Sequence, residues 1–550
     1  MKNIIKGQNN NTGTINTYQI INSSFITINI SIPINSILEK FPYIKKFFSE
    51  SKLIAVKNNS KDEVNNLNNE GVEYFLQKEF EKAIDYFKRA ISIDNSVSEI
   101  YYNLGNAKFY YYTKNIKKYN ITEITEIFNE IITEYSNAIS LKEDYRYYYN
   151  RGTLYAYIEK YNLALDDLSK SINININIDK VRHPEPYINR ANIYLIKNNN
   201  NDAEKDLKIA EELANKEDYY LLSVLYNNIG NTYLQKNDLY NAEKYYTESL
   251  KIDEEYIYPI LGIAILYMKK YEESKNDTEY KKSLEMFDSA KKIDNNFDGI
   301  YYNESHLYNI KASISNNEND YLYSIKLLDK AIECAQLNNN NKSLYYYAKG
   351  IVYNNLYNLF KKNEYKDKVI TSYLLSIELN KDDFNPYYNL ANFYDSIGNK
   401  TEAINYYTKA ISINPEHESS YNNRALVSID LQEYDKAIID INKILEINPN
   451  NFGAYYNLGV IYAMQNKIQL AIECFYRCVN SVNNKDKKIK MNSYYNLGIL
   501  KGRMGDNESA INDIIKSYEL GNENCLNIIK EEAYKYNNKI AISYLNGKII

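Results

Sequence analysis

The sequence is poor in the residues on which most enzyme and metal sites depend. Its 550 residues include no tryptophan, four cysteines and three histidines. His183, His306 and His417 lie too far apart in sequence to suggest a catalytic triad, and no glycine-rich phosphate-binding loop is present. We therefore expect no enzymatic activity, no cofactor and no metal site.

The four cysteines do not form the pattern of a disulfide framework. Cys474 and Cys478 are four residues apart, so on a helix they share one face and provide half of a metal site at most. Cys478 also stands where related segments of the chain carry a small residue, which favours a structural role. So few cysteines in a long chain indicate a reducing compartment, and we expect a cytoplasmic protein.

Long apolar runs and strongly charged runs are missing as well. No run approaches the roughly 18 apolar residues of a membrane-spanning helix, and the N-terminal residues MKNIIKGQNNN lack the apolar core of a secretory signal. The net charge is −5, and no segment rich in Lys and Arg is long enough to follow a phosphate backbone. We expect neither membrane insertion nor a nucleic-acid partner.

A position for a small residue recurs along the chain, four residues after an aromatic residue or Leu. Eight of the 17 glycines occupy it, and Ala or Ser occupies it elsewhere. The glycines are Gly71, Gly105, Gly152, Gly230, Gly262, Gly350, Gly459 and Gly498, and the substitutes are Ala191, Ser305, Ala391 and Ala425. In the clearest copy Ala391 is followed by Tyr394, Ala403, Tyr407 and Ala410.

This pattern resembles the tetratricopeptide repeat, a helix–turn–helix unit of about 34 residues. About twelve copies extend from Val64 to about Gly521. The resemblance implies an all-α fold, a solenoid in which helical hairpins form a right-handed superhelix, and a role in macromolecular binding. Tyrosine, of which there are 61, replaces the family's tryptophan in most copies.

The repeats divide the chain into three regions. Residues 1–63 precede the array, residues 64–521 form it, and residues 522–550 are expected to be capping helices. Tyr18 to Ile32 is rich in β-branched residues that partly alternate with polar ones, so we expect one or two strands there. For the first 60 or so residues, a poorly ordered tail and a small oligomerisation element are both compatible with the sequence.

Four repeats, the second, sixth, seventh and eighth, are longer than the others. The inserts of the seventh and eighth are about seven residues, close to two helical turns, so one turn is added to each helix of a hairpin. We expect taller hairpins in the middle of the array. For the seventh insert, Ser315 to Tyr321, a loop is the alternative.

Asparagine recurs at two positions of the first helices, which line the concave surface in tetratricopeptide arrays. The sixth position, two residues before the small residue, is Asn in ten of twelve copies, although only 82 of the 550 residues are Asn. Only Ile260 and Ala348 interrupt the series. The resemblance implies a peptide-binding groove lined by Asn69, Asn103, Asn150, Asn189, Asn228, Asn303, Asn389, Asn423, Asn457 and Asn496, with Asn106, Asn192, Asn231 and Asn392 at the ninth position. The alternative is that Asn belongs to the general consensus of the repeat.

The function implied is a non-enzymatic scaffold or adaptor whose concave groove binds an extended segment of a protein or peptide partner through an asparagine ladder. A peptide-sensing regulatory protein and the substrate-recruiting subunit of a separate enzyme are the alternatives. Relatives that grip a C-terminal carboxylate use Lys and Arg, whereas here Arg146 is the one obvious basic candidate, so that mode is disfavoured. His306, one residue beyond the small position, is a weaker candidate for the groove. The sequence leaves the oligomeric state open.

Overall fold

The computed structural model describes residues 62–114, 121–176, 183–335, 339–480 and 487–547. These residues form 26 α-helices and no strand, which confirms the expected all-α repeat array. The strands expected between Tyr18 and Ile32 lie outside the described residues. The chain divides into two compact units, residues 1–362 and 363–550.

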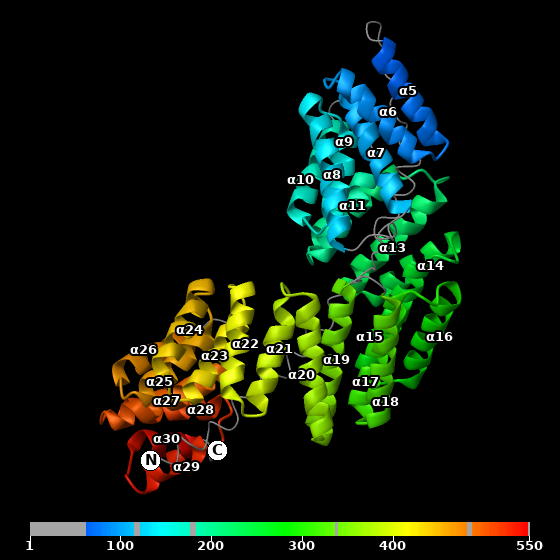
Figure 1. Ribbon diagram of the computed structural model, residues 1–550. Coiled ribbons are helices and arrows are strands. Elements are labelled where there is room, and N and C mark those ends of the chain that lie inside the picture. Colours follow the sequence, from blue (N-terminus) through cyan, green and yellow to red (C-terminus); the bar gives the residue numbers. More distant parts are fainter. Residues whose placement is uncertain (1–61, 115–120, 177–182, 336–338, 481–486, 548–550) are drawn as a thin grey trace. The chain divides into compact units, whose positions relative to one another are not determined.

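The first unit contains fifteen described helices in a continuous series (Figure 1). They are α5 (Asp62–Leu76), α6 (Phe80–Ile93), α7 (Ser98–Lys114), α8 (Ile121–Leu141), α9 (Tyr145–Tyr157), α10 (Tyr161–Ile174), α11 (Glu185–Ile196), α12 (Asn200–Leu213), α13 (Tyr219–Gln235), α14 (Leu239–Ile252), α15 (Ile257–Ser274), α16 (Asp277–Ile293), α17 (Asp298–Ser315), α18 (Glu318–Cys334) and α19 (Asn339–Phe360).

The second unit contains the remaining eleven described helices. They are α20 (Asn363–Leu379), α21 (Phe384–Ser396), α22 (Lys400–Ile413), α23 (Glu418–Asp430), α24 (Tyr434–Ile447), α25 (Phe452–Met464), α26 (Ile468–Val479), α27 (Lys487–Arg503), α28 (Asn507–Glu519), α29 (Cys525–Tyr534) and α30 (Lys539–Gly547).

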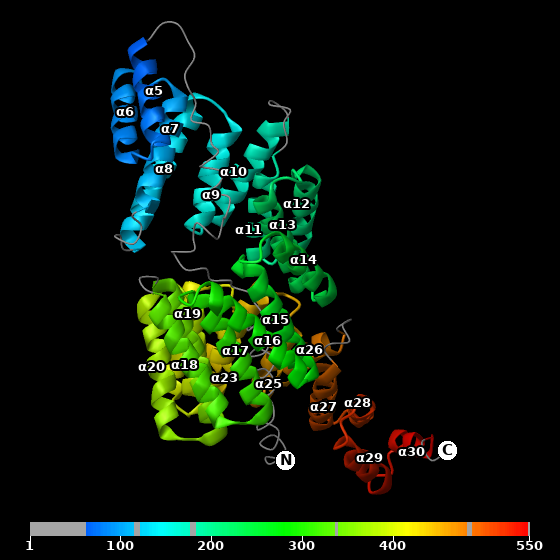
Figure 2. The ribbon, with the colours of Figure 1, turned by 90° about the vertical axis from the view of Figure 1, so that its right-hand side faces the viewer.

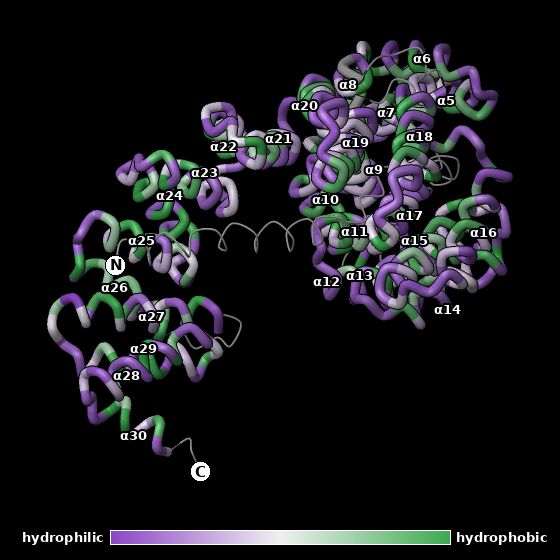
Figure 3. The backbone as a smooth tube through the Cα atoms, turned by 90° about the horizontal axis from the view of Figure 1, so that it is seen from below, coloured by the Kyte–Doolittle hydropathy of each residue, from purple (hydrophilic) through white to green (hydrophobic). Residues whose placement is uncertain are grey.

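Helices α5 to α28 follow one another as twelve pairs, one pair for each expected repeat. Eleven pairs lie within one unit and pack as hairpins, as α13–α14 and α17–α18 do in Figure 2, whereas α19 and α20 fall on either side of the division. Hydrophilic and hydrophobic residues alternate along the helices of both units (Figure 3). Each helix therefore turns one face toward its neighbours and another toward solvent.

The inserted residues lengthen helices. In the sixth and seventh repeats the helices α15 to α18 have 17 or 18 residues, compared with 13 and 14 in α21 and α22. The expectation of taller hairpins is confirmed. The insert of the seventh repeat is helical too, because α17 continues to Ser315 and α18 begins at Glu318.

Asparagine also begins and ends helices in this chain. Its side chain caps the first backbone amides of α12, α16, α18, α22 and α25, and five asparagines have the left-handed backbone that follows a helix. Both roles suit a short amide side chain that bonds the local backbone. Part of the high asparagine content is thus explained by helix boundaries.

Each hairpin is closed by a bulky side chain of the second helix that fits against the small residue of the first. Tyr246 of α14 is fully buried and contacts two such positions, Gly230 of its own repeat and Gly262 of the next. A methyl group would lie 2.6 Å from the Tyr246 ring at Gly230 and 2.5 Å from it at Gly262. The small position is therefore needed because one aromatic ring packs against both first helices.

The C-terminal helices cover the last apolar face of the array. Cys525, Ile529 and Ala533 of α29 and Ala541 of α30 are buried in one cluster with residues of α28. Open arrays require such a cover, since the final repeat has no successor to bury its face.

The packing at Tyr246 gives a first prediction. Gly262→Ala should lower the free energy of unfolding by about 1–3 kcal/mol, because the added methyl group overlaps a ring that is packed on both sides. Gly502→Ala is the matched control: Gly502 is in α27, and a methyl group there would meet only Ala510 at 3.8 Å. That change should be neutral or stabilising by about 0.5–1 kcal/mol. Urea denaturation of the two variants measures both effects, and equal destabilisation would refute the assignment of the small position.

Candidate binding surface on the first helices

First helices of successive repeats contact one another within each unit, as α11 and α13 do in the first unit and α25 and α27 in the second. Their sixth and ninth positions consequently form a row that passes from repeat to repeat. The asparagines in this row differ in burial, and this difference decides what each amide can do.

In repeats two to five, the asparagines of the row are buried at most positions: Asn103, Asn106, Asn150, Asn189 and Asn228 are 0–6% exposed. Asn150 Nδ2 donates to Asn106 Oδ1 at 3.0 Å, and the Tyr135 hydroxyl donates to the same oxygen at 2.8 Å. Tyr135 belongs to the second helix of the repeat of Asn106, whereas Asn150 belongs to the next repeat. One amide oxygen therefore connects a hairpin to its successor.

Other buried amides make the same kind of connection. Asn103 Nδ2 donates to Asn68 Oδ1 at 3.0 Å, and Asn189 Nδ2 lies 3.1 Å from both the Tyr149 hydroxyl and Thr153 Oγ1 of the preceding repeat. A neutral hydrogen bond contributes only about 0.5–1.5 kcal/mol net, but leaving a buried amide without a partner costs about 1–3 kcal/mol. These bonds favour one register between neighbouring repeats.

The second unit repeats this motif in a more open setting. Asn423 Nδ2 donates to Asn392 Oδ1 at 2.9 Å, and the Tyr407 hydroxyl donates to the same oxygen at 2.6 Å. Asn457 Nδ2 donates to Asn422 Oδ1 at 3.1 Å. Here the asparagines of the row are partly exposed at every position: Asn389, Asn392, Asn423, Asn457 and Asn496.

Apolar side chains accompany the open asparagines. Leu426, Val460 and Ile499 each lie three residues after a sixth-position asparagine, and all are partly exposed. Residues three apart share a helix face, so repeats ten, eleven and twelve each present one amide beside one aliphatic side chain.

The remaining asparagines of the row are not equivalent. Asn69 is exposed, and Asn192 and Asn231 are partly exposed. Asn231 Oδ1 accepts from the Tyr246 hydroxyl at 2.7 Å. Asn303 Nδ2 donates to the Gly299 carbonyl of its own helix at 2.7 Å, so its amide does not join neighbouring repeats through this bond.

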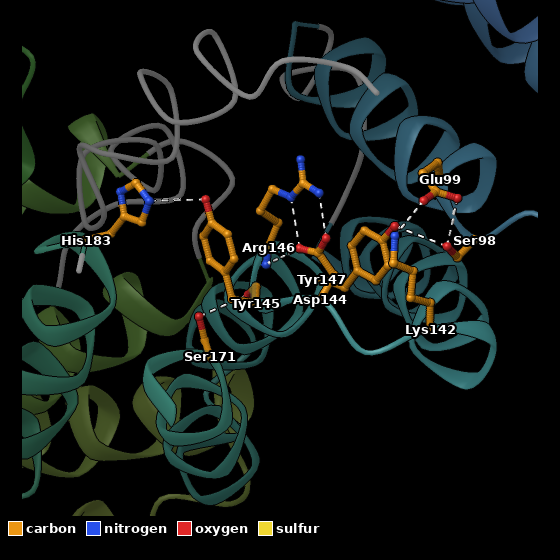
Figure 4. A network of polar contacts seen from close by, with 9 residues as sticks. All are labelled: Ser98, Glu99, Lys142, Asp144, Tyr145, Arg146, Tyr147, Ser171 and His183. Carbon is orange, nitrogen blue, oxygen red and sulfur yellow. Dashed lines mark hydrogen bonds and ion pairs between the residues drawn. The ribbon is translucent and has the colours of Figure 1, made fainter. Parts of the chain in front are cut away.

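Charged residues gather where the first helices of repeats two and three begin (Figure 4). Glu99 pairs with Lys142 at 3.0 Å, and Arg146 Nε donates to Asp144 at 2.8 Å. Burial pushes the pKa of Asp144 upward, but hydrogen bonds and charge from Arg146 outweigh this and hold that pKa below its usual range. Arg146, the one basic candidate for gripping a carboxylate, is thus bound to a carboxylate of its own chain.

Comparison with known proteins agrees with the fold. Models of the tetratricopeptide repeat match residues 65–96, 224–256, 384–417, 418–451 and 441–473. The chain is a tetratricopeptide repeat protein. Proteins with these repeats typically act as non-catalytic scaffolds for protein–protein interaction.

Solved structures with similarity to the chain include one described as the crystal structure of MamA, at 22% identity and a TM-score of 0.26, covering 31% of this chain and 91% of that one. Another is MamA 41-end from Desulfovibrio magneticus RS-1, at 18% identity and a TM-score of 0.26. This match covers 31% of the present chain and 94% of that one. No curated protein matches the chain.

The tetratricopeptide array also contains a set of ion pairs that sequence reasoning missed. Arg151, Arg190 and Arg424 each precede the small residue of a first helix and form two hydrogen bonds with an aspartate sixteen residues later, on their own second helix. A third bond reaches a hydroxyl on the second helix of the preceding repeat, at 2.8–3.0 Å. The partners are Asp167, Asp206 and Asp440, with Ser136, Ser169 and Thr408. The constant spacing of sixteen was the available signal.

The described residues offer little for other chemistry. Within them, no three His, Cys, Asp or Glu side chains are grouped as metal ligands would be, and no helix is long and apolar enough to cross a membrane. Cys478 is buried, and its thiol lies 3.3 Å from the Phe452 carbonyl, in agreement with a structural role.

The arginine–aspartate pairs give a second prediction. Arg424→Leu should lower the free energy of unfolding by about 3 kcal/mol or more, because the Asp440 carboxylate, 6% exposed, then stays buried without its charge partner. Arg424→Leu combined with Asp440→Leu should recover most of that loss. Denaturant titration of single and double variants measures the coupling, and a double variant as unstable as the single one would contradict it.

A third prediction concerns pH and helix α17. Burial lowers the pKa of His306 to about 4, and burial raises the pKa of Asp298, at the start of the same helix, to about 6. Between pH 4 and 6 the folded chain holds both groups neutral, while the unfolded chain has a protonated histidine and an ionised aspartate. The folded state therefore has one proton fewer at His306 and one more at Asp298, so the two contributions to stability oppose each other.

Single substitutions should reveal each contribution. As pH falls from 6 to 4, the free energy of unfolding of His306→Gln should rise relative to that of the original chain, by at most about 1.4 kcal/mol per pH unit. Over the same range, the free energy of unfolding of Asp298→Asn should fall relative to that of the original chain. Urea midpoints at three pH values test this. Parallel pH profiles for both variants and the original chain would show that neither group titrates as described.

Proposed function

We propose that the protein is a non-enzymatic cytoplasmic adaptor, and that the first helices of repeats nine to twelve bind an extended segment of a partner protein. The observation that carries this proposal is the partial exposure of the whole asparagine row in the second unit, with an aliphatic side chain three residues from three of its sixth-position amides. Only four cysteines in a chain of 550 residues agree with a reducing compartment.

The chemistry of the row favours recognition of a polypeptide main chain. An asparagine side chain donates through its nitrogen and accepts through its oxygen, so it matches both the carbonyl and the amide of an extended peptide. Asn457 Nδ2 donates to one oxygen of the preceding repeat and Asn423 Nδ2 to two, those of Asn392 and the Tyr388 hydroxyl, and both asparagines remain partly exposed. Each bond contributes little, so affinity has to be distributed over several repeats.

The aliphatic residues define the rest of the ligand. Leu426, Val460 and Ile499 carry no charge and provide contact area beside the amides. We therefore expect a ligand segment with few charged residues, in which apolar side chains meet this aliphatic row. In the first unit, Asn69, Asn192 and Asn231 are exposed or partly exposed and are proposed as separate ligand contacts, while the buried asparagines there support the register of the repeats.

The fourth prediction tests this surface. Peptides selected for binding to the full chain from a random displayed library should be poor in charge. Leu426→Lys combined with Val460→Lys should weaken their binding by about tenfold or more, because a charge then replaces apolar contact at two successive repeats. Ile439→Lys on α24 is the matched control, since Ile439 is 68% exposed and lies on a second helix.

Replacing Asn389, Asn423 and Asn457 together by Ala tests the amides themselves. Binding should weaken by about tenfold or more, with some loss of stability because two of these amides also join repeats. Circular dichroism and thermal melting separate the two effects. Unchanged peptide affinity in both the lysine and the alanine variants would place the binding surface elsewhere.

A further inference from the structure

A cation covers a tyrosine ring at the same place in several repeats. Lys170, Arg477 and Lys516, all on second helices, lie 5.4, 5.1 and 5.2 Å from the ring centroids of Tyr148, Tyr455 and Tyr494. In each case the tyrosine stands on the first helix of the same repeat, 22 residues earlier. The tyrosine face at this position thus attracts a cation in both units of the chain.

Repeat five departs from this pattern at the same two positions. Its tyrosine is Tyr226 on α13, and the residue 22 positions later is Glu248 on α14. The preceding second helix departs as well: α12 presents Glu211 where the helices before Tyr148, Tyr455 and Tyr494 present Ile139, Leu445 and Val479. Two carboxylates therefore replace an aliphatic residue and the repeat's own cation.

Both carboxylates are close enough to act on the tyrosine. Burial raises the pKa of Tyr226, and the negative charges of Glu211 and Glu248 raise it further. Tyr245 of α14 lies beside it, with ring centroids 6.0 Å apart and ring planes 49° apart. Tyr245 also stacks on Tyr233 at 5.6 Å, so Tyr245 contacts both of the other rings.

Two of these rings, Tyr233 and Tyr245, line a small open pocket at the seam between repeats four and five, and Tyr226 lies beside Tyr245. The other lining residues are the apolar Leu207 and Ile229, Thr232, and the charged Glu204, Lys208 and Glu211 of α12. Aromatic faces beside carboxylates are the surroundings that an alkylammonium or guanidinium group prefers.

Lys208, which lines this pocket, and Lys251 of α14 belong to exposed surface pairs. Lys208 pairs with Glu204 at 2.9 Å and is 65% exposed, and Lys251 pairs with Glu248 at 2.7 Å and is 63% exposed. Exposed pairs contribute about 0–1 kcal/mol, so an incoming cation displaces them at small cost.

The carboxylates of α12 differ in how far their charge is already matched. Glu204 pairs with Lys236 as well as with Lys208, so its charge is balanced within the chain. Glu211 makes no ion pair with any described residue. The unmatched carboxylate is therefore Glu211, while Glu248 is matched only by the exposed Lys251, and both act on the Tyr226 ring.

We propose that this pocket, together with the Tyr226 ring beside it, is a receptor for one lysine or arginine side chain of a partner protein, held by the ring face of Tyr226 and by the carboxylates of Glu211 in the pocket and Glu248 on α14. It is separate from the asparagine row. Tyr226 and Asn228 are two residues apart, which places them about 200° apart around α13. The array therefore has a second contact surface that recognises charge, whereas the row recognises an uncharged main chain.

The absence of tryptophan from the sequence allows a specific reporter. Tyr226→Trp gives the full chain a single tryptophan and keeps an aromatic face that binds cations well. The probe is the peptide acetyl-Gly-Lys-Gly-amide, with the Nε-acetylated lysine peptide as its neutral control. Tryptophan fluorescence should respond saturably to the lysine peptide, with a dissociation constant on the order of millimolar. An equal response to the acetylated peptide would overturn the proposal.

A second variant restores the repeat's own cation. Glu248→Lys, made with and without the tryptophan reporter, should seat its lysine on Tyr226 as Lys170 sits on Tyr148, and binding of the lysine peptide should weaken about fivefold or more. Glu126→Lys on α8, an exposed position far from the pocket in sequence, is the control for charge and should leave binding unchanged. Calorimetry measures the variants that lack the reporter, so the test does not depend on the introduced tryptophan. Equal affinity in Glu248→Lys and Glu126→Lys would contradict the site.

Discussion

The contact between a small residue on one helix and a bulky residue on the next determines the rest of this structure. At Tyr246 one ring touches the backbone of two first helices, at Gly230 and Gly262, where no side chain can be accommodated without displacement. This contact sets how closely hairpins approach one another. Only at that distance does the amide of one repeat reach an oxygen of the next, as Asn150 reaches Asn106.

Asparagine side chains at equivalent positions of the repeat serve different purposes according to their burial. Asn150 and Asn457 both donate across a repeat boundary, at 3.0 and 3.1 Å. Asn150 is fully buried, so its bond contributes to register, whereas Asn457 is partly exposed and is accessible to a ligand. The proposed binding surface follows from this difference in exposure rather than from the identity of the residue.

Much of the fold was readable from the sequence because the repeat is a local pattern. The spacing of Ala391, Tyr394, Ala403 and Tyr407 specified two helices and their contact without reference to distant parts of the chain. The burial of Asn150 was not readable, since it depends on how closely the neighbouring first helix packs. Arg151 and Asp167 were missed because sixteen residues separate them across a hairpin. Glu248 is recognised as unusual only beside the cations that other repeats place there.

Hydrogen exchange of asparagine side-chain amides tests the central claim most directly. With 15N-labelled asparagine in the full chain, and resonances assigned by single substitution, the exchange rates of Asn150 and Asn457 can be compared. The Asn150 amide should exchange only when its repeat opens, and a peptide bound to the second unit should leave its rate unchanged. The Asn457 amide should exchange far faster in the free chain and slow when that peptide binds. Equal protection of both amides, or no slowing of Asn457, would contradict the account.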